Sequence, residues 1–449
     1  MMALVNPEEG KRVADLDRAH VFHSWSAQGA LNPLAVEGAE GCWVWDYEGN
    51  RYLDISSQLV NVNIGHQHPK VVKAIQDQAA VLTTINPNHA NVQRSEAAAL
   101  IATLAPQQMN KVFFTNGGAD AVENAIRMAR LHTGRRKVLT FYRSYHGNTG
   151  AAIVATGDPR RWPNEFADGH VHFFGPYLYR SSFWASTEAE ECDRALAHLE
   201  QVILFEGPAS IAAILLESVV GTAGILVPPE GYLSGVRALC GRFGIVLIAD
   251  EVMCGFGRTG SWFAFENFGI EPDLITFAKG VNSGYVPVGG VIIADEIAHT
   301  FDELVFPGGL TYSGHPLAAA SIVAALSAMQ DEGIVENARM IGTDVLGPGL
   351  RALQDKHPVI GEVRGLGVFW ALELVSDRAS REPLAPYGGS SPAMADLLAA
   401  CKANGLLPFT NYNRLHVVPP CTISVEETRE ALKRLDAVFS VVDRHYVGS

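Results

Sequence analysis

Short apolar runs alternate with segments of helical periodicity through the middle of the chain. The runs predicted to be buried strands are Val112–Thr115, Lys137–Tyr142, Ala212–Leu216, Ile245–Ala249, Leu274–Phe277 and Val288–Ile293. Between them, residues 120–132 and 232–243 carry apolar side chains at helical spacing. This alternation predicts an α/β fold with a mostly parallel sheet and helices on both faces. In such sheets ligands bind beyond the C-terminal ends of the strands.

The two ends of the chain follow a different pattern. Residues 43–54 alternate around a Glu-Gly-Asn turn, which predicts a β-hairpin. From about Gly333 the pattern is α+β: a long helix, paired strands over 359–374, a helix near 393–404 and a last helix from Val425. Residues 378–391 hold Pro, Gly and Ser and are predicted to form a surface loop.

Composition excludes several classes of function. Lys and Arg number 34 against 48 Asp and Glu, a net charge of −14, which disfavours binding to nucleic acids or anionic membranes. None of the six cysteines falls in a CxxC pair, which argues against zinc and thioredoxin-type sites and favours a reducing compartment. The most apolar stretch, 211–229, carries Glu217 and two glycines, so we expect a buried strand and loop rather than a membrane span. We expect a cytoplasmic protein.

Two ionisable residues end neighbouring apolar runs. Asp250 closes the run 245–249, and Lys279 follows the run 274–278. A lysine at a strand end is most often a surface residue, but here Ala278 and Gly280 flank it. A desolvated lysine becomes nucleophilic and can form a Schiff base with an aldehyde, while a carboxylate can keep a pyridinium nitrogen protonated. The pair therefore indicates a pyridoxal phosphate (PLP) site.

Asp250 also admits other interpretations, a helix cap or, with Glu251, a metal site. No His or Cys is spaced nearby for a metal, and adjacent residues of a strand point to opposite faces. We therefore predict no metal site and favour the pyridinium partner. Val252 would then share the face of Asp250 and pack under the cofactor ring.

The segment 113–130 reads as a strand, a turn and a helix. In the turn, Gly117, Gly118 and Ala119 let backbone amides approach an anion, and the helix near Asp120 adds its positive end. The turn matches neither a GxGxxG nor a P-loop pattern, which argues against NAD and nucleoside triphosphates.

Three further positions have candidate roles at the same strand edge. Tyr145 and His146 follow the predicted strand 137–142, where an aromatic ring could stack on a flat cofactor. Glu217 closes its own strand as Asp250 does. Thr311 lies in the loop GGLTYSGHP, which is suited to binding a phosphate.

Taken together, these segments resemble the class III aminotransferases, a branch of the fold-type I PLP enzymes. The resemblance runs from about His20 to Val418, and its motifs are DEVMCGFGRTG, the AKG lysine, FFTNGGADAVENA, SYHG and TYSGHP. It implies a mostly parallel seven-stranded sheet flanked by helices, in a large PLP-binding domain over residues 60–330. A smaller α+β domain would combine residues 1–59 with residues 331–449.

The resemblance also implies roles for individual residues. Lys279 would bind the cofactor and shuttle a proton, and Asp250 would pair with the pyridine nitrogen. The other expected PLP contacts are Tyr145 and Val252 on the ring faces, Glu217 near the phenolic oxygen, Gly118 and Ala119 on the phosphate, and Thr311 on the phosphate from a partner subunit. The family implies a homodimer with both sites at the interface, and a tetramer is a further possibility.

Within the family the sequence resembles the ω-amino acid or amine:pyruvate branch, because Met253 follows DEV where other branches carry Gln. The implied reaction moves an amino group from a primary amine to pyruvate, giving alanine by a ping-pong mechanism. Alternatives are another PLP reaction, such as that of a glutamate-1-semialdehyde-type aminomutase, and transamination to 2-oxoglutarate. A catalytically silent PLP-fold protein and a metal-dependent hydrolase are disfavoured.

The expected substrate pocket departs from the family pattern. Val60 stands after Leu59 where relatives often carry Trp, and Trp25 keeps an aromatic residue near the N-terminus. Phe409 occupies the position of a mobile arginine that binds carboxylates in relatives. We hypothesise that Arg414 takes over this role, because an acceptor keto acid needs a cation. The sequence does not identify the amine donor, and an S preference would rest on family analogy alone.

Overall fold

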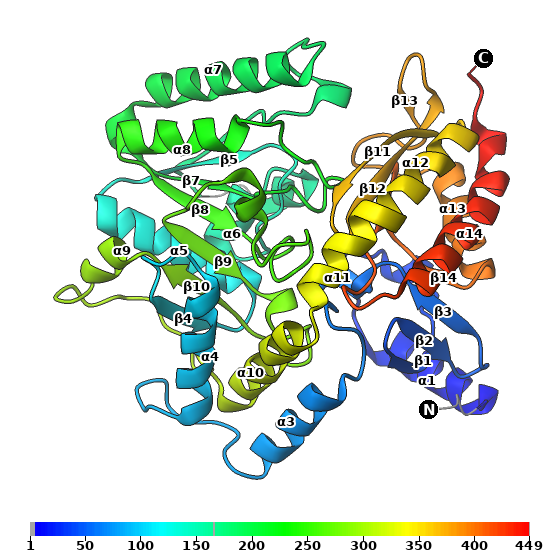
Figure 1. Ribbon diagram of the computed structural model, residues 1–449, viewed down its shortest axis with the longest axis horizontal. Coiled ribbons are helices and arrows are strands. Elements are labelled where there is room, and N and C mark those ends of the chain that lie inside the picture. Colours follow the sequence, from blue (N-terminus) through cyan, green and yellow to red (C-terminus); the bar gives the residue numbers. More distant parts are fainter. Residues whose placement is uncertain (1–4, 165–166, 449) are drawn as a thin grey trace.

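The computed structural model describes residues 5–164 and 167–448, and a seven-stranded sheet forms its centre (Figure 1). The strand order is β4-β10-β9-β8-β7-β5-β6, and only β10 runs antiparallel to its neighbours. Their bounds are β4 Lys111–Thr115, β5 Lys137–Phe141, β6 His170–Phe173, β7 Ile211–Leu216, β8 Val246–Asp250, β9 Leu274–Phe277 and β10 Gly289–Ile293. The predicted α/β sheet is confirmed.

Alternating residues of the central strands bury the sheet on both faces. Ile248 of β8 joins one apolar cluster with α5 (Gly118–Thr133) and α6 (Gly150–Ala155). Its neighbour Leu247 joins a second cluster with Val236 of α8 (Tyr232–Phe243), against which α7 (Glu188–Glu206) packs. This follows from the period-two alternation of side chains along a strand, and it explains why a continuous apolar run is needed in each central strand.

The two ends of the chain lie side by side on the right of Figure 1. Strands β1 (Val36–Glu40), β2 (Trp43–Asp46) and β3 (Arg51–Asp54) form a meander, and β14 (Leu406–Leu407) extends it by pairing parallel to β3. A second small sheet holds β11 (Ile360–Leu366), β12 (Phe369–Asp377), β16 (Arg414–Val417) and β15 (Phe409–Asn411), with β13 (Glu382–Pro383) beside β12.

Helices complete the molecule around these sheets. The remaining ones are α1 Pro7–His20, α2 Ser57–Val60, α3 Pro69–Ala79, α4 Val92–Leu104, α9 Asp295–His299, α10 Pro316–Asp331, α11 Ile334–Met340, α12 Gly347–Lys356, α13 Pro392–Ala403 and α14 Val425–Val442. Figure 1 shows α10 and α11 leading from the large sheet to the C-terminal part. Among the described residues, no helix is both long and apolar enough to cross a membrane.

Two details differ from the sequence predictions. Strand β6 was not predicted, because its residues are His-Val-His-Phe and only Phe173 is fully buried. The segment 378–391, predicted as a loop, contains the short strand β13. The predicted strands, the hairpin over 43–54 and the helices over 120–132, 232–243 and 393–404 are all present.

Candidate active site

Asp250 and Lys279 meet at the C-terminal edge of the large sheet. Asp250 is the last residue of β8, and Lys279 follows β9 after one residue, Ala278. These two strands pair in parallel, with Asp250 opposite Thr276. Lys279 has a φ of 45°, a left-handed conformation that costs about 1 kcal/mol or more for a residue with a side chain. Such strain persists only where the surroundings hold it, and it is concentrated at functional sites.

The Asp250 carboxylate is buried and held on both oxygens. His146 Nδ1 lies 2.6 Å from Oδ2, while Thr276 Oγ1 and the Val252 amide each donate to Oδ1 at 3.1 Å. The second ring nitrogen of His146 is buried and has no partner among the described residues. The histidine therefore helps to fix the orientation of the Asp250 carboxylate.

Glu251 points to the opposite side of the strand, as its position next to Asp250 predicts. It accepts hydrogen bonds from Ser218 Oγ at 2.5 Å and from the Ala264 amide at 2.7 Å. Burial raises the pKa of Glu251 to about 7. These hydrogen bonds tie Glu251 to the neighbouring segments of the chain. In the described ranges, no group of three or more His, Cys, Asp or Glu is placed to hold a metal.

The surroundings of the Lys279 amine change its basicity. Burial lowers the pKa of Lys279, against the opposing effect of the Asp250 and Glu217 carboxylates, and Arg160 lowers it further. Glu217 follows β7 and accepts from the Tyr145 amide at 3.1 Å and the Gly221 amide at 2.8 Å. Burial raises the pKa of Glu217 to about 7. A desolvated amine beside partly neutralised acids carries less positive charge than a surface lysine.

Arg160 is a site residue that the sequence analysis missed. Its guanidinium lies over the Tyr145 ring, 3.6 Å from the centroid, and pairs with Asp158, with Nε 2.9 Å from Oδ2. One face of Tyr145 is therefore covered by a cation. Nothing in the local sequence ATGDPRRW signals this role, because Arg160 and Tyr145 are brought together only by the loop that follows α6.

The predicted phosphate turn opens α5. Gly117 is extended, with a φ of 178°, and Gly118 is the first helical residue. A Cβ on Gly118 would lie 2.8 Å from Val252 Cγ1, and one on Gly147 would lie 2.6 Å from Ala119 Cβ. The turn thus sits directly beside Val252 and the segment that carries His146, and its amides are free to face an anion.

The predicted substrate residues lie in contrasting surroundings. Trp25 and Leu59 are exposed in the single chain, and so is Thr311, whereas Val60 is fully buried beside Met253 and near Phe409. Ser57, Gln58 and Val60 all have φ between 46° and 59°. Three positive φ values within four residues mark a strained turn, and such strain is concentrated at functional sites.

Arg414 is buried in an ion-pair cluster. Its Nε donates to Glu373 Oε2 at 3.1 Å, and Nη1 to Asn411 Oδ1 at 3.1 Å. The hairpin register pairs Phe409 with His416 and Asn411 with Arg414, so the turn at 411–413 brings Phe409 and Arg414 to the same face of the sheet. Lys279 is not among the contacts of Arg414, and its role in carboxylate binding stays a prediction.

Comparison with known proteins decides the family. The family model described as aminotransferase class-III matches residues 25–439. The chain belongs to the class III aminotransferases. It is 34% identical to the hypotaurine/taurine–pyruvate aminotransferase of Paracoccus denitrificans, over 90% of each protein. It also resembles the solved structure of a taurine:2-oxoglutarate aminotransferase from Bifidobacterium kashiwanohense, with 42% identity, a TM-score of 0.95 and coverage of 97% and 99%.

A second solved structure agrees with this membership. The (S)-enantioselective omega-transaminase of Thermomicrobium roseum has 37% identity, a TM-score of 0.90 and coverage of 96% of this chain and 98% of its own. Aminotransferases of this class take an amine donor and a keto-acid acceptor and depend on PLP.

The residues at the sheet edge fit PLP. The aldehyde needs a buried amine without a fixed partner, and Lys279 Nζ makes no hydrogen bond within the described chain. The pyridine nitrogen needs a buried carboxylate, which Asp250 supplies. The phosphate needs amides at a helix start, which the turn before α5 supplies.

Two polar residues that follow Lys279 make hydrogen bonds to neighbouring segments. Ser283 Oγ accepts from the Ile64 amide at 3.1 Å, and Asn282 Nδ2 donates to Val286 O at 2.6 Å and to Ser321 Oγ at 2.9 Å. They hold the loop after Lys279 in place.

Proposed function

We propose that this class III aminotransferase moves the amino group of a primary amine or ω-amino acid to pyruvate, giving alanine by a ping-pong mechanism. One observation carries the proposal. The ends of the neighbouring strands β8 and β9 place a buried Lys279 amine, which makes no hydrogen bond in the described chain, at the same sheet edge as the buried Asp250 carboxylate. The pyruvate-using relative supports the choice of acceptor. Bound PLP would supply the electron sink for the substrate carbon.

The chain's own side chains divide the remaining work. Lys279 Nζ, with its lowered pKa, accepts and returns the substrate proton. Asp250 holds a fixed negative charge for the pyridine nitrogen, and His146 orients it at 2.6 Å. Tyr145 offers its ring face to the cofactor, and the start of α5 holds the phosphate.

A dimer belongs to this proposal. Trp25, Leu59 and Thr311 are predicted site residues, and each is exposed in the single chain. A homodimer that contributes Thr311 from the partner subunit accounts for all three exposures, with a tetramer as a possible larger assembly. A cytoplasmic location is the corresponding expectation, because all six cysteines are free and buried thiols.

The half-reaction tests the chemistry directly. Adding 1-phenylethylamine alone to the cofactor-loaded enzyme should bleach its yellow absorbance, and pyruvate should restore the colour while alanine forms. Lys279→Met should bind cofactor without turnover, losing at least 10³-fold in kcat, because the proton-transfer group is gone (~10²–10⁴-fold for general acid–base groups). Continued release of product from the donor without any acceptor, beyond one equivalent per active site, would instead favour another PLP reaction.

Arg160 is the stronger of two candidates for the acceptor carboxylate. Both arginines are ion-paired, Arg160 with Asp158 and Arg414 with Glu373, but Arg160 lies beside Tyr145 and acts on the pKa of Lys279. We expect Arg160→Met to raise KM for pyruvate about tenfold or more, the order of one charge-assisted hydrogen bond. KM for 1-phenylethylamine, which has no carboxylate, should change less than twofold.

Arg414→Met is the matched comparison. If it raises KM for pyruvate while Arg160→Met does not, the arginine assignment reverses to the one expected from the sequence. Repeating both series with 2-oxoglutarate tests the second acceptor, which the Bifidobacterium structure's 42% identity favours. A kcat/KM for 2-oxoglutarate above that for pyruvate would make the five-carbon keto acid the acceptor.

A further inference from the structure

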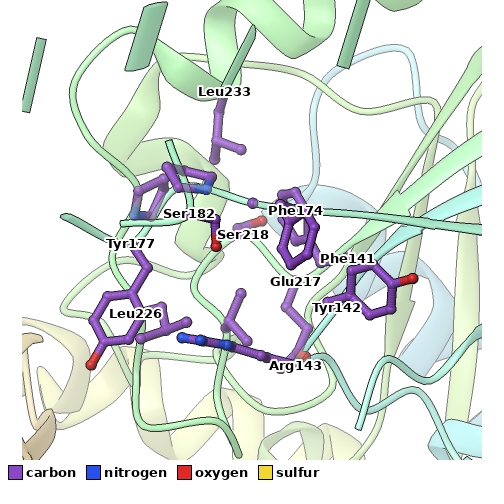
Figure 2. Close-up of a pocket in the computed structure, with 14 residues that line it drawn as sticks. Phe141, Tyr142, Arg143, Phe174, Tyr177, Ser182, Glu217, Ser218, Leu226 and Leu233 are labelled. Atoms are coloured by element: carbon purple, nitrogen blue, oxygen red, sulfur yellow. The ribbon is translucent and has the colours of Figure 1, made fainter. Parts of the chain in front are cut away.

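The candidate site has two parts with different origins. One part is a cavity that Glu217 and Arg143 line together with aromatic residues of the same chain (Figure 2). The other part is the phosphate turn before α5, to which Thr311 of the partner subunit belongs in the proposed dimer. Within its own chain Thr311 is exposed, so contacts elsewhere in the loop 308–315 have to fix its position.

Arg94 of α4 makes one of these contacts. Its Nε donates to Gly314 O at 2.9 Å, across 220 positions of the chain. Its Nη1 donates to Pro87 O at 2.7 Å and to His89 O at 2.9 Å. One guanidinium thus ties the exposed segment before α4 to the loop 308–315.

The contact with Gly314 is too close for a side chain. Gly314 has a φ of 62°, in the left-handed region that favours glycine, and a Cβ there would lie 2.3 Å from Arg94 Nε. The preceding residue, Ser313, donates from Oγ to Phe114 O in β4 at 2.6 Å. The loop is therefore held at two places, by Arg94 on α4 and through Ser313 on β4.

Helix stability does not explain an arginine at this position. The Asn91 side chain caps α4 by accepting from the Arg94 amide at 3.0 Å, so Arg94 lies in the first turn of the helix. A cation in a first turn is repelled by the positive end of the helix dipole. Burial lowers the pKa of Arg94, and no carboxylate of the described chain opposes this effect. The guanidinium is committed to the carbonyl oxygens of two loops and not to an ion pair.

We propose that Arg94 is a positioning residue that acts across the dimer. By holding Gly314 O, it keeps the loop 308–315 of one subunit where Thr311 reaches the phosphate bound by the other. Each cofactor site then depends on an arginine that belongs to the other chain. This inference rests on the dimer of the proposed function and adds to it a residue far from Lys279 in the sequence.

Heterodimers with one visible site test the direction of the effect. Lys279→Met removes the yellow absorbance of its own site, so PLP titration of the apoenzyme reports only the subunit with an intact lysine. In the first heterodimer, Arg94→Met and Lys279→Met lie on different subunits. In the second, both lie on one subunit beside a wild-type partner. Two affinity tags separate each heterodimer from the homodimers.

Only the second heterodimer should bind PLP more weakly, by about tenfold or more, the order of one hydrogen bond to a charged group. In it, the visible site receives its loop from the chain that lacks Arg94. The first heterodimer should match one that carries Lys279→Met alone. Weakening in the first heterodimer, or in neither, would overturn the proposal, and so would a cofactor-loaded enzyme that is monomeric.

Arg135→Met is the matched control for a loss of packing. Arg135 also spends its guanidinium on carbonyl oxygens, with Nη1 2.8 Å from Gly244 O and 3.1 Å from Phe243 O, between α8 and β8. In the same two arrangements it should lower both melting temperatures alike and leave both PLP affinities equal. Arg94→Lys keeps a donor and should recover part of the affinity. If Arg94→Met does not fold, Gly314→Ala displaces the same guanidinium and should give the same pattern.

Thr311→Ala in the two arrangements separates this inference from the proposed function. It should weaken PLP binding in the second arrangement alone. If it does so and Arg94→Met does not, only the inference about Arg94 fails. If Thr311→Ala weakens binding in the first arrangement instead, the loop serves its own subunit and the proposed dimer site is wrong. The titration contains no amine and no keto acid, so a failure of the proposed transamination leaves its result unchanged.

Discussion

A single buried histidine links the stability of this enzyme to acidity. His416 of β16 is fully buried and donates toward Gly221 O at 3.2 Å, and its ring lies tilted against Phe409 with centroids 4.5 Å apart. Burial lowers the pKa of His416 to about 3. The folded protein therefore keeps this ring neutral under conditions in which the unfolded chain takes up a proton.

The sign of the effect follows from linkage. The unfolded pKa is ~6.5, so the stabilising contribution is complete above pH 6.5 and is lost as pH falls toward 3. Between pH 6.5 and 5 the loss is about 2 kcal/mol. We expect His416→Gln, which keeps a donor for Gly221 O, to show a smaller drop in melting temperature between pH 7 and pH 5 than the wild type.

The exposed His89→Gln serves as the control, because it should leave the pH dependence unaltered. Equal drops in melting temperature in the wild type and His416→Gln would show that the buried ring does not determine the loss of stability at low pH.

At the scale of one element, the start of α5 depends on the absence of a side chain. Gly118 leaves space that Val252 Cγ1 fills from the β8 side, and a Cβ there would approach to 2.8 Å. Gly117 has nothing within 4 Å of a Cβ and an extended φ that any residue adopts. We expect Gly118→Ala to weaken PLP binding about tenfold, roughly 1.4 kcal/mol, by displacing the turn.

Gly117→Ala is the matched control and should bind PLP within about twofold of the wild type. Adding Val252→Ala to Gly118→Ala should restore part of the lost affinity, because it removes the obstructing methyl groups. Absorbance titration of the apoenzyme measures all four proteins. A Gly118→Ala enzyme with wild-type affinity would contradict the close approach.

The elements were predictable to the extent that their burial was regular. The central strands are buried on both faces and appear in the sequence as continuous apolar runs. Strand β6 pairs only with β5, alternates histidines with apolar residues and gave no such signal. The hairpin β15–β16 was not among the predicted elements, and its register depends on the turn at 411–413.

The candidate site was predictable where residues follow a strand end. Asp250, Glu217 and Lys279 each close an apolar run, so topology alone brings them to one edge. The contact between His146 and Asp250, 104 positions apart in the chain, and the Arg160 stack on Tyr145 depend on loop paths. Sequence spacing carries no information about such contacts.

At the scale of the whole molecule, one buried arginine ties distant parts of the chain together. Arg258 is fully buried, and its Nη2 donates to Asn63 Oδ1 at 2.7 Å and Ser57 Oγ at 3.2 Å. Its Nη1 bonds the carbonyl oxygens of Pro419 and Val418. The pairing of β3 with β14 makes a second link between the two ends of the chain. The division into residues 1–59 with 331–449 and a large domain over 60–330 stays a prediction.

Arg258 therefore provides a test of how the parts hold together. Arg258→Met removes the arginine donor from four oxygens, of which only Val418 O keeps another donor within the described residues, the Ser57 hydroxyl, and we expect a loss on the order of 3 kcal/mol in stability. Arg258→Lys, with one compact ammonium, cannot reach all four acceptors and should recover only part of it. Arg237→Met, which removes a partly exposed ion pair with Asp273 between α8 and the start of β9, should lose less than about 1 kcal/mol. Thermal unfolding followed by circular dichroism measures the loss of stability. Protease cleavage near residues 331–333 measures whether the junction between the parts has opened. If Arg258→Met melts and resists cleavage as the wild type does, the junction is held by the β3–β14 pairing and the apolar core instead.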